Sequence, residues 1–415
     1  MVYVISKNGQ PLMPTNRHGK VKHLLRSGNA KVVKRCPFTI QLTYESTNHT
    51  QPITLGVDAG SKTIGLSASS ETKEYYSAEV ILRNDIVGLL STRRQNRRTR
   101  RTRKIRYRKC RFLHRMHSKN KGWLAPSIEQ KINTHLRVVR DVCSILPITN
   151  IIVETAAFDI QKIKALESGQ TAPFGTEYQQ GDMLGFWNVR EYVLFRDGHV
   201  CQCCKGKSKH KILNVHHIES RKTGGDAPNN LVTLCETCHD KYHKGIVTLN
   251  IKRGIRHKHD TFMGIMRWTF YNRLKDIYPK VSMTYGYITK NTRIENGLPK
   301  EHRVDALCIA GHPKAERNKE WYYQKKVRCH NRQIHKNTIQ KGGYRKRNQA
   351  PYEVKGFRLF DKVLYNGKEC FIFGRRLSGS FNIRKLDGTK INTGISYKKL
   401  TLLEKRKTTL TERRK

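Results

Sequence analysis

The chain has 415 residues, of which 82 are Lys or Arg and 32 are Asp or Glu, so its formal net charge is +50 at pH 7. This length allows two or three domains, and so large a charge predicts a polyanionic partner, for which nucleic acid is the obvious candidate. No run of about 18 apolar residues occurs and the first ten residues have no apolar signal core, which argues against membrane spanning and secretion.

Residues 1–52 predict a small α/β module. After an initial strand and a turn at Asn8-Gly9, a short basic helix is expected over residues 21–27. Strands with period-two alternation are expected over 30–35 and 38–44. The module has no cluster of ligand-type residues, so its chemistry does not indicate a function.

An apolar strand beginning at Ile53 carries an acid, Asp58, near its middle, and a second strand follows a glycine-containing turn. A buried carboxylate is costly unless it is paired or bound to a metal. We therefore interpret Asp58 as a metal ligand of an RNase H-like sheet. The alternative is an ordinary turn aspartate that precedes Gly60.

Residues 91–121 contain fifteen Lys and Arg and neither acid, Gly nor Pro. Such a segment can form a helix once its charges are neutralised, and Arg can fork onto phosphates. A disordered basic tail is the alternative, but the segment lies between two apolar ones. The arginines expected to bind nucleic acid are Arg93, Arg94, Arg97, Arg98, Arg100, Arg101, Arg103, Arg106 and Arg108.

An amphipathic helix is expected from Pro126 to Leu146, and the next strand, over residues 150–159, carries Glu154. Two acids on adjacent core-type strands support the metal-site interpretation better than one. Residues 160–190 are weakly periodic and are interpreted as a linker.

Two CxxC pairs about thirty residues apart predict one closed tetrahedral zinc site of structural type. The ligands are Cys201, Cys204, Cys235 and Cys238, and Cys203 could compete with Cys204. Because this site uses four of the eleven cysteines, the chain is expected to lie in a reducing compartment.

A second ligand set overlaps the first. His239 and His243, at i and i+4 on a helix, share one face, and with His216 they can hold one divalent cation, expected to be Mg²⁺. His217 is not needed as a ligand and can take a proton from water as a general base. Asn230 can orient that base or its loop. These residues resemble the HNH, or ββα-metal, nuclease motif. The alternative, a zinc ribbon with spare histidines, leaves them unexplained.

A second amphipathic helix is expected over 261–278, a strand over 281–289, and a further helix from Lys300. On that last helix His302 and Asp305 point the same way. A salt-bridged core aspartate is the alternative for Asp305.

The carboxylates Asp58, Glu154 and Asp305, with His302, can hold two divalent ions about 3.5 to 4 Å apart, which clamps the attacking and leaving oxygens in phosphodiester hydrolysis. Oxygen ligands favour Mg²⁺. Because a sheet collects ligands that are scattered in sequence, each break tolerates an insertion.

Residues 312–350 are basic and are predicted to be mostly loop and short helix. The alternation over 357–403, with Asn-Gly and Asp-Gly turns, predicts a small antiparallel barrel. This barrel is a candidate reader of duplex DNA, and a capping role is the alternative.

The order of these motifs resembles the IscB family of transposon-encoded RNA-guided nucleases, over essentially the whole chain. The resemblance rests on Pro-Leu-Met-Pro at 11–14, GVDAG at 56–60, the arginine-rich segment, IIVET at 151–155, the HNH insert and HRVDALCIAG at 302–311. It implies an α/β fold with a split RNase H-like RuvC domain, an inserted ββα-metal HNH domain and an arginine-rich bridge helix. A small N-terminal α/β module and a C-terminal small β-barrel-like module complete it.

The implied domains follow the chain in order. They are the PLMP module 1–52, RuvC-I 53–90, the bridge helix 91–121, RuvC-II with a linker 122–190, the HNH domain 191–250, a linker with RuvC-III 251–325, and a module that reads a target-adjacent motif 326–415.

The resemblance further implies an RNA-guided double-stranded DNA endonuclease with an omega RNA guide gripped by the bridge-helix arginines. Asp58, Glu154, His302 and Asp305 would cut the displaced strand, and His217 would be the base that cuts the strand paired to the guide. The particle would be a monomeric ribonucleoprotein of a prokaryotic cytoplasm, at the nucleoid when on target. A protein-guided HNH nicking enzyme and a non-cleaving accessory protein are the alternatives.

Overall fold

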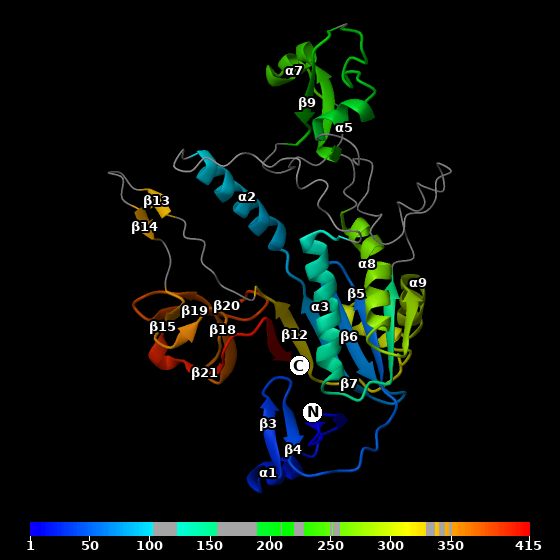
Figure 1. The fold of residues 1–415 in the computed structure, drawn as a ribbon, viewed down its shortest axis with the longest axis vertical. Coiled ribbons are helices and arrows are strands. Elements are labelled where there is room, and N and C mark those ends of the chain that lie inside the picture. The colour runs from blue at the N-terminus through cyan, green and yellow to red at the C-terminus, as the bar shows by residue number, and fades with distance from the viewer. Residues whose placement is uncertain are drawn as a thin grey trace. The chain divides into compact units, whose positions relative to one another are not determined.

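The computed structural model describes residues 1–102, 123–155, 189–208, 210–219, 228–249, 251, 258–328, 337–339, 345–347 and 351–415. The chain divides into two compact units, one of residues 1–158 and 266–415 and the other of 159–265. Helices and strands occur in both (Figure 1), which confirms the predicted mixed α/β class. Within the described part of the chain, no helix has the length and apolar character to cross a membrane.

The N-terminal module is a four-stranded sheet in the order β2-β1-β4-β3 with one helix. The Pro-Leu-Met-Pro segment forms β2, an edge strand, where the absent proline N–H groups are tolerated. The core consists of aliphatic side chains from each element, such as Val2, Val21 and Ile40. The elements are β1 (Val2–Ile5), β2 (Pro11–Thr15), α1 (His18–Arg26), β3 (Ala30–Lys34) and β4 (Thr39–Leu42).

The centre of the first unit is a seven-stranded mixed sheet in the order β11-β8-β5-β6-β7-β12-β22. The strands β5, β6 and β7 run antiparallel in succession, whereas β8 is parallel to both β5 and β11. The strands are β5 (Thr54–Ala59), β6 (Thr63–Ser69), β7 (Glu74–Ile81), β8 (Asn150–Thr155), β11 (Val281–Tyr285), β12 (Trp321–Lys326) and β22 (Thr409–Arg414).

The prediction of loop and short helix after residue 312 is wrong for β12. This strand pairs in parallel with β7 and antiparallel with β22. Its buried positions are Tyr322, Gln324 and Lys326, so two of its three inward side chains are polar. An alternation of this kind gives no hydrophobic signal with period two, and the strand is therefore hidden from sequence patterns.

Two long helices pack against each other in this unit (Figure 1). The helix α3 (Pro126–Cys143) begins with a proline in its first turn, as predicted, and α8 (Lys258–Lys275) contacts it. The Arg273 guanidinium lies 2.7 Å from the Glu129 carboxylate, and the rings of His135 and Phe270 are 5.3 Å apart. These contacts fix one helical layer of the unit.

The predicted strand over 281–289 is wrong in its second half. The strand β11 ends at Tyr285, and the helix α9 (Gly286–Glu295) follows at once. The residues Ile288, Thr289 and Thr292 are β-branched and favour a strand locally. Tertiary packing overrides this preference, because Thr289 is buried on the inner face of the helix.

The helix α10 (His302–Ile309) packs on the central sheet at two glycines. A Cβ atom added at Gly56 would lie 1.9 Å from the carbonyl oxygen of Ala306, and one added at Gly65 would lie 1.9 Å from that of His302. Backbone therefore meets backbone at both positions, which places the first turn of α10 over β6 and its later residues over β5.

We expect Gly65→Ala to destabilise the first unit by about 3 kcal/mol, because the new methyl group must push α10 off the sheet. The measurement is the shift in the thermal unfolding midpoint. Gly19→Ala, in α1, is the matched control, since an added Cβ there meets nothing within 4 Å. It is expected to be neutral or slightly stabilising. Equal effects of the two changes would contradict the close approach of α10.

The segment after residue 351 forms a five-stranded antiparallel sheet in the order β20-β19-β18-β17-β21. The predicted Asn366-Gly367 turn joins β17 to β18 with φ angles of 48° and 71°, as a type I′ turn requires. The two edges, β20 and β21, have no ladder between them in the described residues. Its strands are β17 (Lys362–Tyr365), β18 (Lys368–Arg375), β19 (Ser380–Arg384), β20 (Lys390–Ser396) and β21 (Thr401–Glu404), beside the short pairs β13 (Asn337–Ile339) with β14 (Arg345–Arg347) and β15 (Glu353–Val354) with β16 (Phe357–Arg358).

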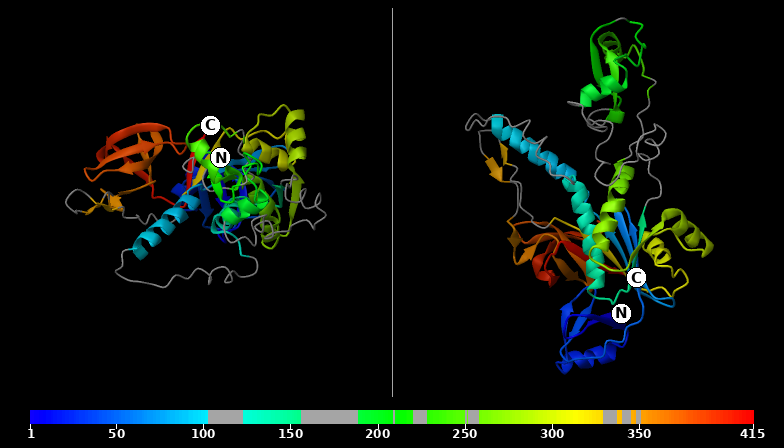
Figure 2. Two further views of the ribbon diagram at one scale, coloured as in Figure 1. Left: turned by 90° about the horizontal axis from the view of Figure 1, so that it is seen from above. Right: turned by 45° about the vertical axis from the view of Figure 1, so that its right-hand side comes forward.

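The basic helix α2 (Ile86–Thr102) starts ahead of the predicted start at Ser91 and is continuous (Figure 2). The side chains of Arg93, Arg94 and Arg97 are exposed. The rest of the predicted basic helix, residues 103–121, and most of the predicted linker over 160–190 lie outside the described residues. So do the side chains of the other predicted arginines, Arg98, Arg100, Arg101, Arg103, Arg106 and Arg108.

The second unit is a two-stranded antiparallel sheet followed by a helix, with a further helix before it. The carboxylate of Asp197, just after α5, accepts a hydrogen bond from the Thr233 N–H at 2.8 Å and so ties α5 to β10. The elements are α5 (Val189–Arg196), β9 (Leu213–His217), β10 (Leu231–Cys235) and α7 (Glu236–His243).

Candidate functional site

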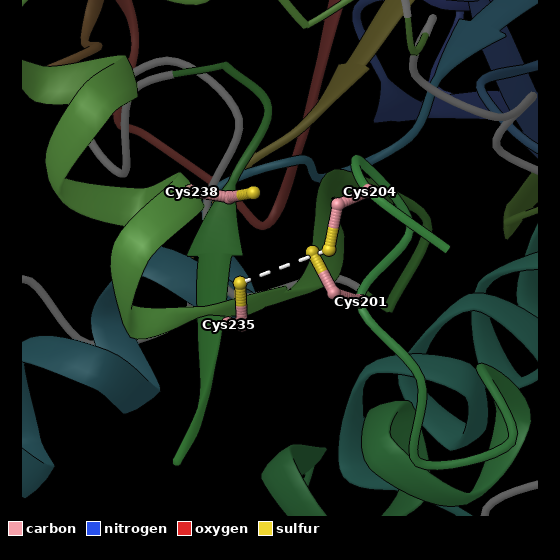
Figure 3. Close-up of side chains that lie close together, drawn as sticks. All are labelled: Cys201, Cys204, Cys235 and Cys238. Atoms are coloured by element: carbon pink, nitrogen blue, oxygen red, sulfur yellow. Dashed lines mark hydrogen bonds between the residues drawn. The ribbon is translucent and has the colours of Figure 1, made fainter. Parts of the chain in front are cut away.

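The four predicted zinc ligands converge in the second unit (Figure 3). Cys201 and Cys204 lie in the turn after α5, Cys235 ends β10, and Cys238 is on α7. Their four sulfur atoms lie within 4.8 Å of one another, and those of Cys204 and Cys235 are 3.9 Å apart. A tetrahedral zinc site with Zn–S distances of about 2.3 Å has sulfur–sulfur edges of roughly 3.8 Å. The cage therefore fits Zn²⁺.

The surroundings of these thiols differ. The hydroxyl of Ser208 bonds to Cys204 and lowers the pKa of that thiol to about 6. Burial raises the pKa of Cys201 and that of Cys238. Cys203, the predicted competitor, is half-buried beside the cage but is not one of its four converging thiols.

Three histidines form the second cluster. A ring nitrogen each from His216, His239 and His243 lies within 4.8 Å of the other two, and the Nε2 atoms of His239 and His243 are 3.2 Å apart. His216 is buried, and its Nε2 has no hydrogen-bond partner within the protein. A buried polar atom without a partner is costly. A cation bound by the three nitrogens would satisfy it.

Burial, and then the neighbouring imidazoles, lower the pKa of His216 to about 4. This ring is therefore neutral at physiological pH, the state in which imidazole binds metals. The ring of Tyr242 packs edge-on against it, with centroids 4.6 Å apart. Sequence reasoning missed Tyr242, although its position between His239 and His243 on one helix is a signal for such a contact.

The donor chemistry of this cluster bears on which cation it holds. Imidazole suits first-row transition metals, whereas Mg²⁺ prefers oxygen ligands. The three nitrogens therefore favour a transition metal over the predicted Mg²⁺.

His217 follows His216 on β9, and successive side chains of a strand point to opposite faces. It is not one of the three converging histidines. Asn230 is fully buried and holds the loop after His217: its Oδ1 accepts from the N–H of Glu219 at 2.9 Å, and its Nδ2 donates to the carbonyl of Glu219 at 3.0 Å. Asn230 thus fixes the chain two residues beyond His217.

The predicted acids of the first unit lie on one face of the central sheet. Asp58 on β5 is directly paired with Glu154 on β8, and paired residues of neighbouring strands share a face. Asp58 is also paired with Gly65, over which the first turn of α10 lies. The sheet register and the glycine contact together bring His302 and Asp305 to the same face.

Protein groups hold two of these acids. The Nδ1 of His302 lies 2.6 Å from Asp58 Oδ2, and this hydrogen bond raises the pKa of His302. The Arg293 Nε, on α9, lies 2.9 Å from Asp305 Oδ1 as an ion pair without hydrogen-bond alignment. Sequence reasoning missed Arg293, because it assigned no helix to this segment.

Among the four predicted residues of this site, Glu154 is the one whose pKa is shifted far from its ordinary value. Burial, and then the charges of Asp58 and Asp305, raise the pKa of its carboxyl to about 7, against a hydrogen bond with Thr289 that lowers it. Burial and the charge of Asp58 likewise raise the pKa of Asp305. Mutual repulsion of this kind is what a bound cation relieves.

The acids are nevertheless not gathered as tightly as the histidines. Among the described residues, no three ligand atoms from Asp58, Glu154, His302 and Asp305 lie within 4.8 Å of one another. Their oxygens suit a hard divalent cation, but one oxygen of Asp305, Oδ1, is paired with Arg293.

In comparisons with known proteins, two protein families match separate parts of the chain. The RRXRR protein family matches residues 2–181, and the HNH endonuclease family matches residues 201–245, which include both metal clusters. A stretch of 53 residues, 12% of the chain, is 46% identical to anaredoxin of Nostoc sp. and covers 70% of that protein, so the two are members of one family over this stretch.

Solved structures of Streptococcus thermophilus Cas9 are also similar. The complex with the AGGA PAM matches 45% of this chain at 16% identity with a TM-score of 0.28, and the complex with the AGAA PAM matches 63% at 14% identity with a TM-score of 0.32. The matched regions cover 26% and 32% of those Cas9 chains, so this chain spans about a quarter to a third of their length.

Proposed function

We propose that this chain, an IscB-type nuclease with an RRXRR region and an HNH endonuclease domain, is an RNA-guided endonuclease that cuts both strands of DNA. In this proposal the second unit cuts the strand paired to the guide, and the acids of the first unit cut the displaced strand.

The histidine cluster is the observation that carries the proposal. It lies within the HNH endonuclease match, and its buried His216 nitrogen has no partner within the protein. A zinc ribbon alone accounts for the four cysteines, but not for three converging imidazoles next to His217.

The site residues of the second unit have separate proposed roles in DNA hydrolysis. His217 takes the proton of the attacking water, and Asn230 keeps its loop in place through the backbone of Glu219. The neutral His216, with His239 and His243, would hold the cation. The cysteine cage fixes the end of β10 and the start of α7 relative to the turn after α5.

The first unit contributes oxygen ligands from three separate chain segments. Asp58 and Glu154 are fixed by the sheet register, and Asp305 by the packing of α10. His302 holds the Asp58 carboxylate. Divalent cations bound here, proposed to be two Mg²⁺, and at the histidines would polarise the scissile phosphodiester and stabilise charge on its leaving oxygen.

The net charge of +50 supports RNA as the guide. In guided nucleases base pairing selects the sequence, and the protein holds an A-form heteroduplex by its backbone and shape. The exposed Arg93, Arg94 and Arg97 of α2 are suited to its phosphates. We assign recognition of a short target-adjacent motif to the sheet after residue 351.

The test of guidance is the RNA that stays with the protein. Protein expressed together with its flanking locus is expected to retain a structured transcript through purification, and ribonuclease treatment is expected to abolish cutting of a matching plasmid. Sequencing the retained RNA identifies the guide. Unimpaired cutting after complete RNA removal would instead support a nuclease that grips DNA directly.

One observation favours a second candidate function, a nicking enzyme with the histidine site alone. The acids of the first unit are spread apart, and Asp305 is paired with Arg293. If that pairing persists on DNA, only the second unit cuts.

A further inference from the structure

Two exposed tyrosines flank a glycine at the junction of β11 and α9. The rings of Tyr285 and Tyr287 are stacked, with centroids 6.1 Å apart and an angle of 10° between their planes. The exposed fraction is 36% for Tyr285 and 60% for Tyr287. A nearly parallel pair of aromatic rings at the surface offers a flat apolar face.

The glycine between them touches a proposed catalytic acid. A Cβ atom at Gly286 would lie 3.1 Å from Glu154 Oε1. In the sheet, Thr284 is paired with Glu154 and Tyr285 with Thr155. The residue between the two tyrosines therefore lies against the Glu154 carboxylate, and the tyrosines are its immediate neighbours in the chain.

The helix α9 has two chemically distinct faces. Its inner face carries Thr289, which bonds to Glu154, and Arg293, which pairs with Asp305. Its outer face is exposed and combines one aromatic ring, one cation, one amide and one aliphatic chain at i, i+3, i+4 and i+7. These residues are Tyr287, Lys290, Asn291 and Ile294.

We propose that the Tyr285–Tyr287 pair is a stacking platform for an unpaired base of the DNA strand that the acids cut. Only a single strand offers free base faces, since those of a duplex are stacked on one another. Lys290, one turn along the same face, is placed for a neighbouring phosphate. This inference rests on the proposed function of the acids, because it assigns their substrate strand.

The platform would hold the strand through base faces without reading their sequence. Stacking on tyrosine tolerates any base, which suits an enzyme whose target is chosen by a guide. It also explains why an exposed aromatic pair lies beside a charged site.

The experiment compares Tyr287→Leu and Tyr287→Phe in the RNA-loaded protein. The probe is a target duplex with a preformed bubble and 2-aminopurine placed at successive positions of the strand not paired to the guide. Fluorescence is read in an Asp58→Asn background, so that the DNA stays intact. Cutting of each strand is timed separately in the otherwise unchanged protein.

With the tyrosine or phenylalanine, 2-aminopurine at one or two positions is expected to be quenched by stacking. The leucine variant is expected to lose that quenching and to cut the displaced strand about tenfold more slowly, with the paired strand unaffected. Tyr44→Leu is the matched control, because Tyr44 is 41% exposed and belongs to the segment after β4. It is expected to change neither readout.

Three results would overturn the platform: no position whose quenching depends on Tyr287, equal slowing of both strands, or loss of activity in the phenylalanine variant. Failure of the proposed function is separable from these. It would show as displaced-strand cutting that survives Asp58→Asn, whatever the fluorescence reports.

Discussion

Asp58→Asn is expected to leave the protein able to cut only one strand of its target. The change removes the carboxylate charge that His302 holds and that, after burial, helps to raise the pKa of Glu154 and that of Asp305. If Asp58 is a ligand of the proposed metal site, which would stabilise several kcal/mol of transition-state charge, its loss predicts a fall of about a thousandfold or more in displaced-strand cutting. A supercoiled target plasmid is then expected to accumulate as the nicked circle.

Strand assignment requires separate end labels on the two strands. Asp141→Asn is the matched control, since that aspartate pairs with Arg137 on the outer side of α3 and lies outside the site. It is expected to cut both strands at the normal rate. Linear product from Asp58→Asn at the wild-type rate would support the one-site nicking enzyme.

His217→Ala is expected to have the reciprocal effect, with the strand paired to the guide left intact and the displaced strand still cut. Loss of a general base lowers such rates by about 10² to 10⁴-fold. The same end-labelled duplex gives the measurement. The three converging histidines and the cysteine cage are untouched by this change, so metal content is expected to remain constant.

The control for the second unit is His210→Ala. This histidine lies 3.5 Å from Glu236 at the start of α7 and is outside both metal clusters. It is expected to retain both cuts. If His217→Ala also retained them, the base would have to be sought elsewhere in the unit.

The sequence is informative about this protein where chemistry determines spacing. The spacing of the cysteine pairs and of the i, i+4 histidines identifies them as metal ligands. In the structure the ligand atoms of each set lie within 4.8 Å of one another. The strand with Glu154 and the helix with Asp305 are also predictable, because their apolar patterns are regular.

The sequence is less informative where contacts between distant segments determine which secondary structure a segment adopts and how closely two elements pack. The first residues of α9, 286–289, are predicted as a strand until the burial of Thr289 is known, and no element is predicted for the rest of the helix, so Arg293 and the tyrosine pair are missed. The strand β7 has no counterpart in the prediction. Nor does any local pattern reveal that Gly56 and Gly65, far from residue 302, permit α10 to approach the sheet.

The pairing of β12 with β22 has an evolutionary consequence. Lys326 is the partner of Thr409, and the N–H of Val327 donates to the carbonyl of Thr408 at 2.9 Å, so everything between these residues leaves and rejoins the scaffold at a single point. Recombination can replace the segment between the two strands with a longer, shorter or unrelated one while β12 and β22 stay hydrogen-bonded to each other. In the proposed function, such an exchange changes the part assigned to target recognition and leaves Asp58 and Glu154 on their strands.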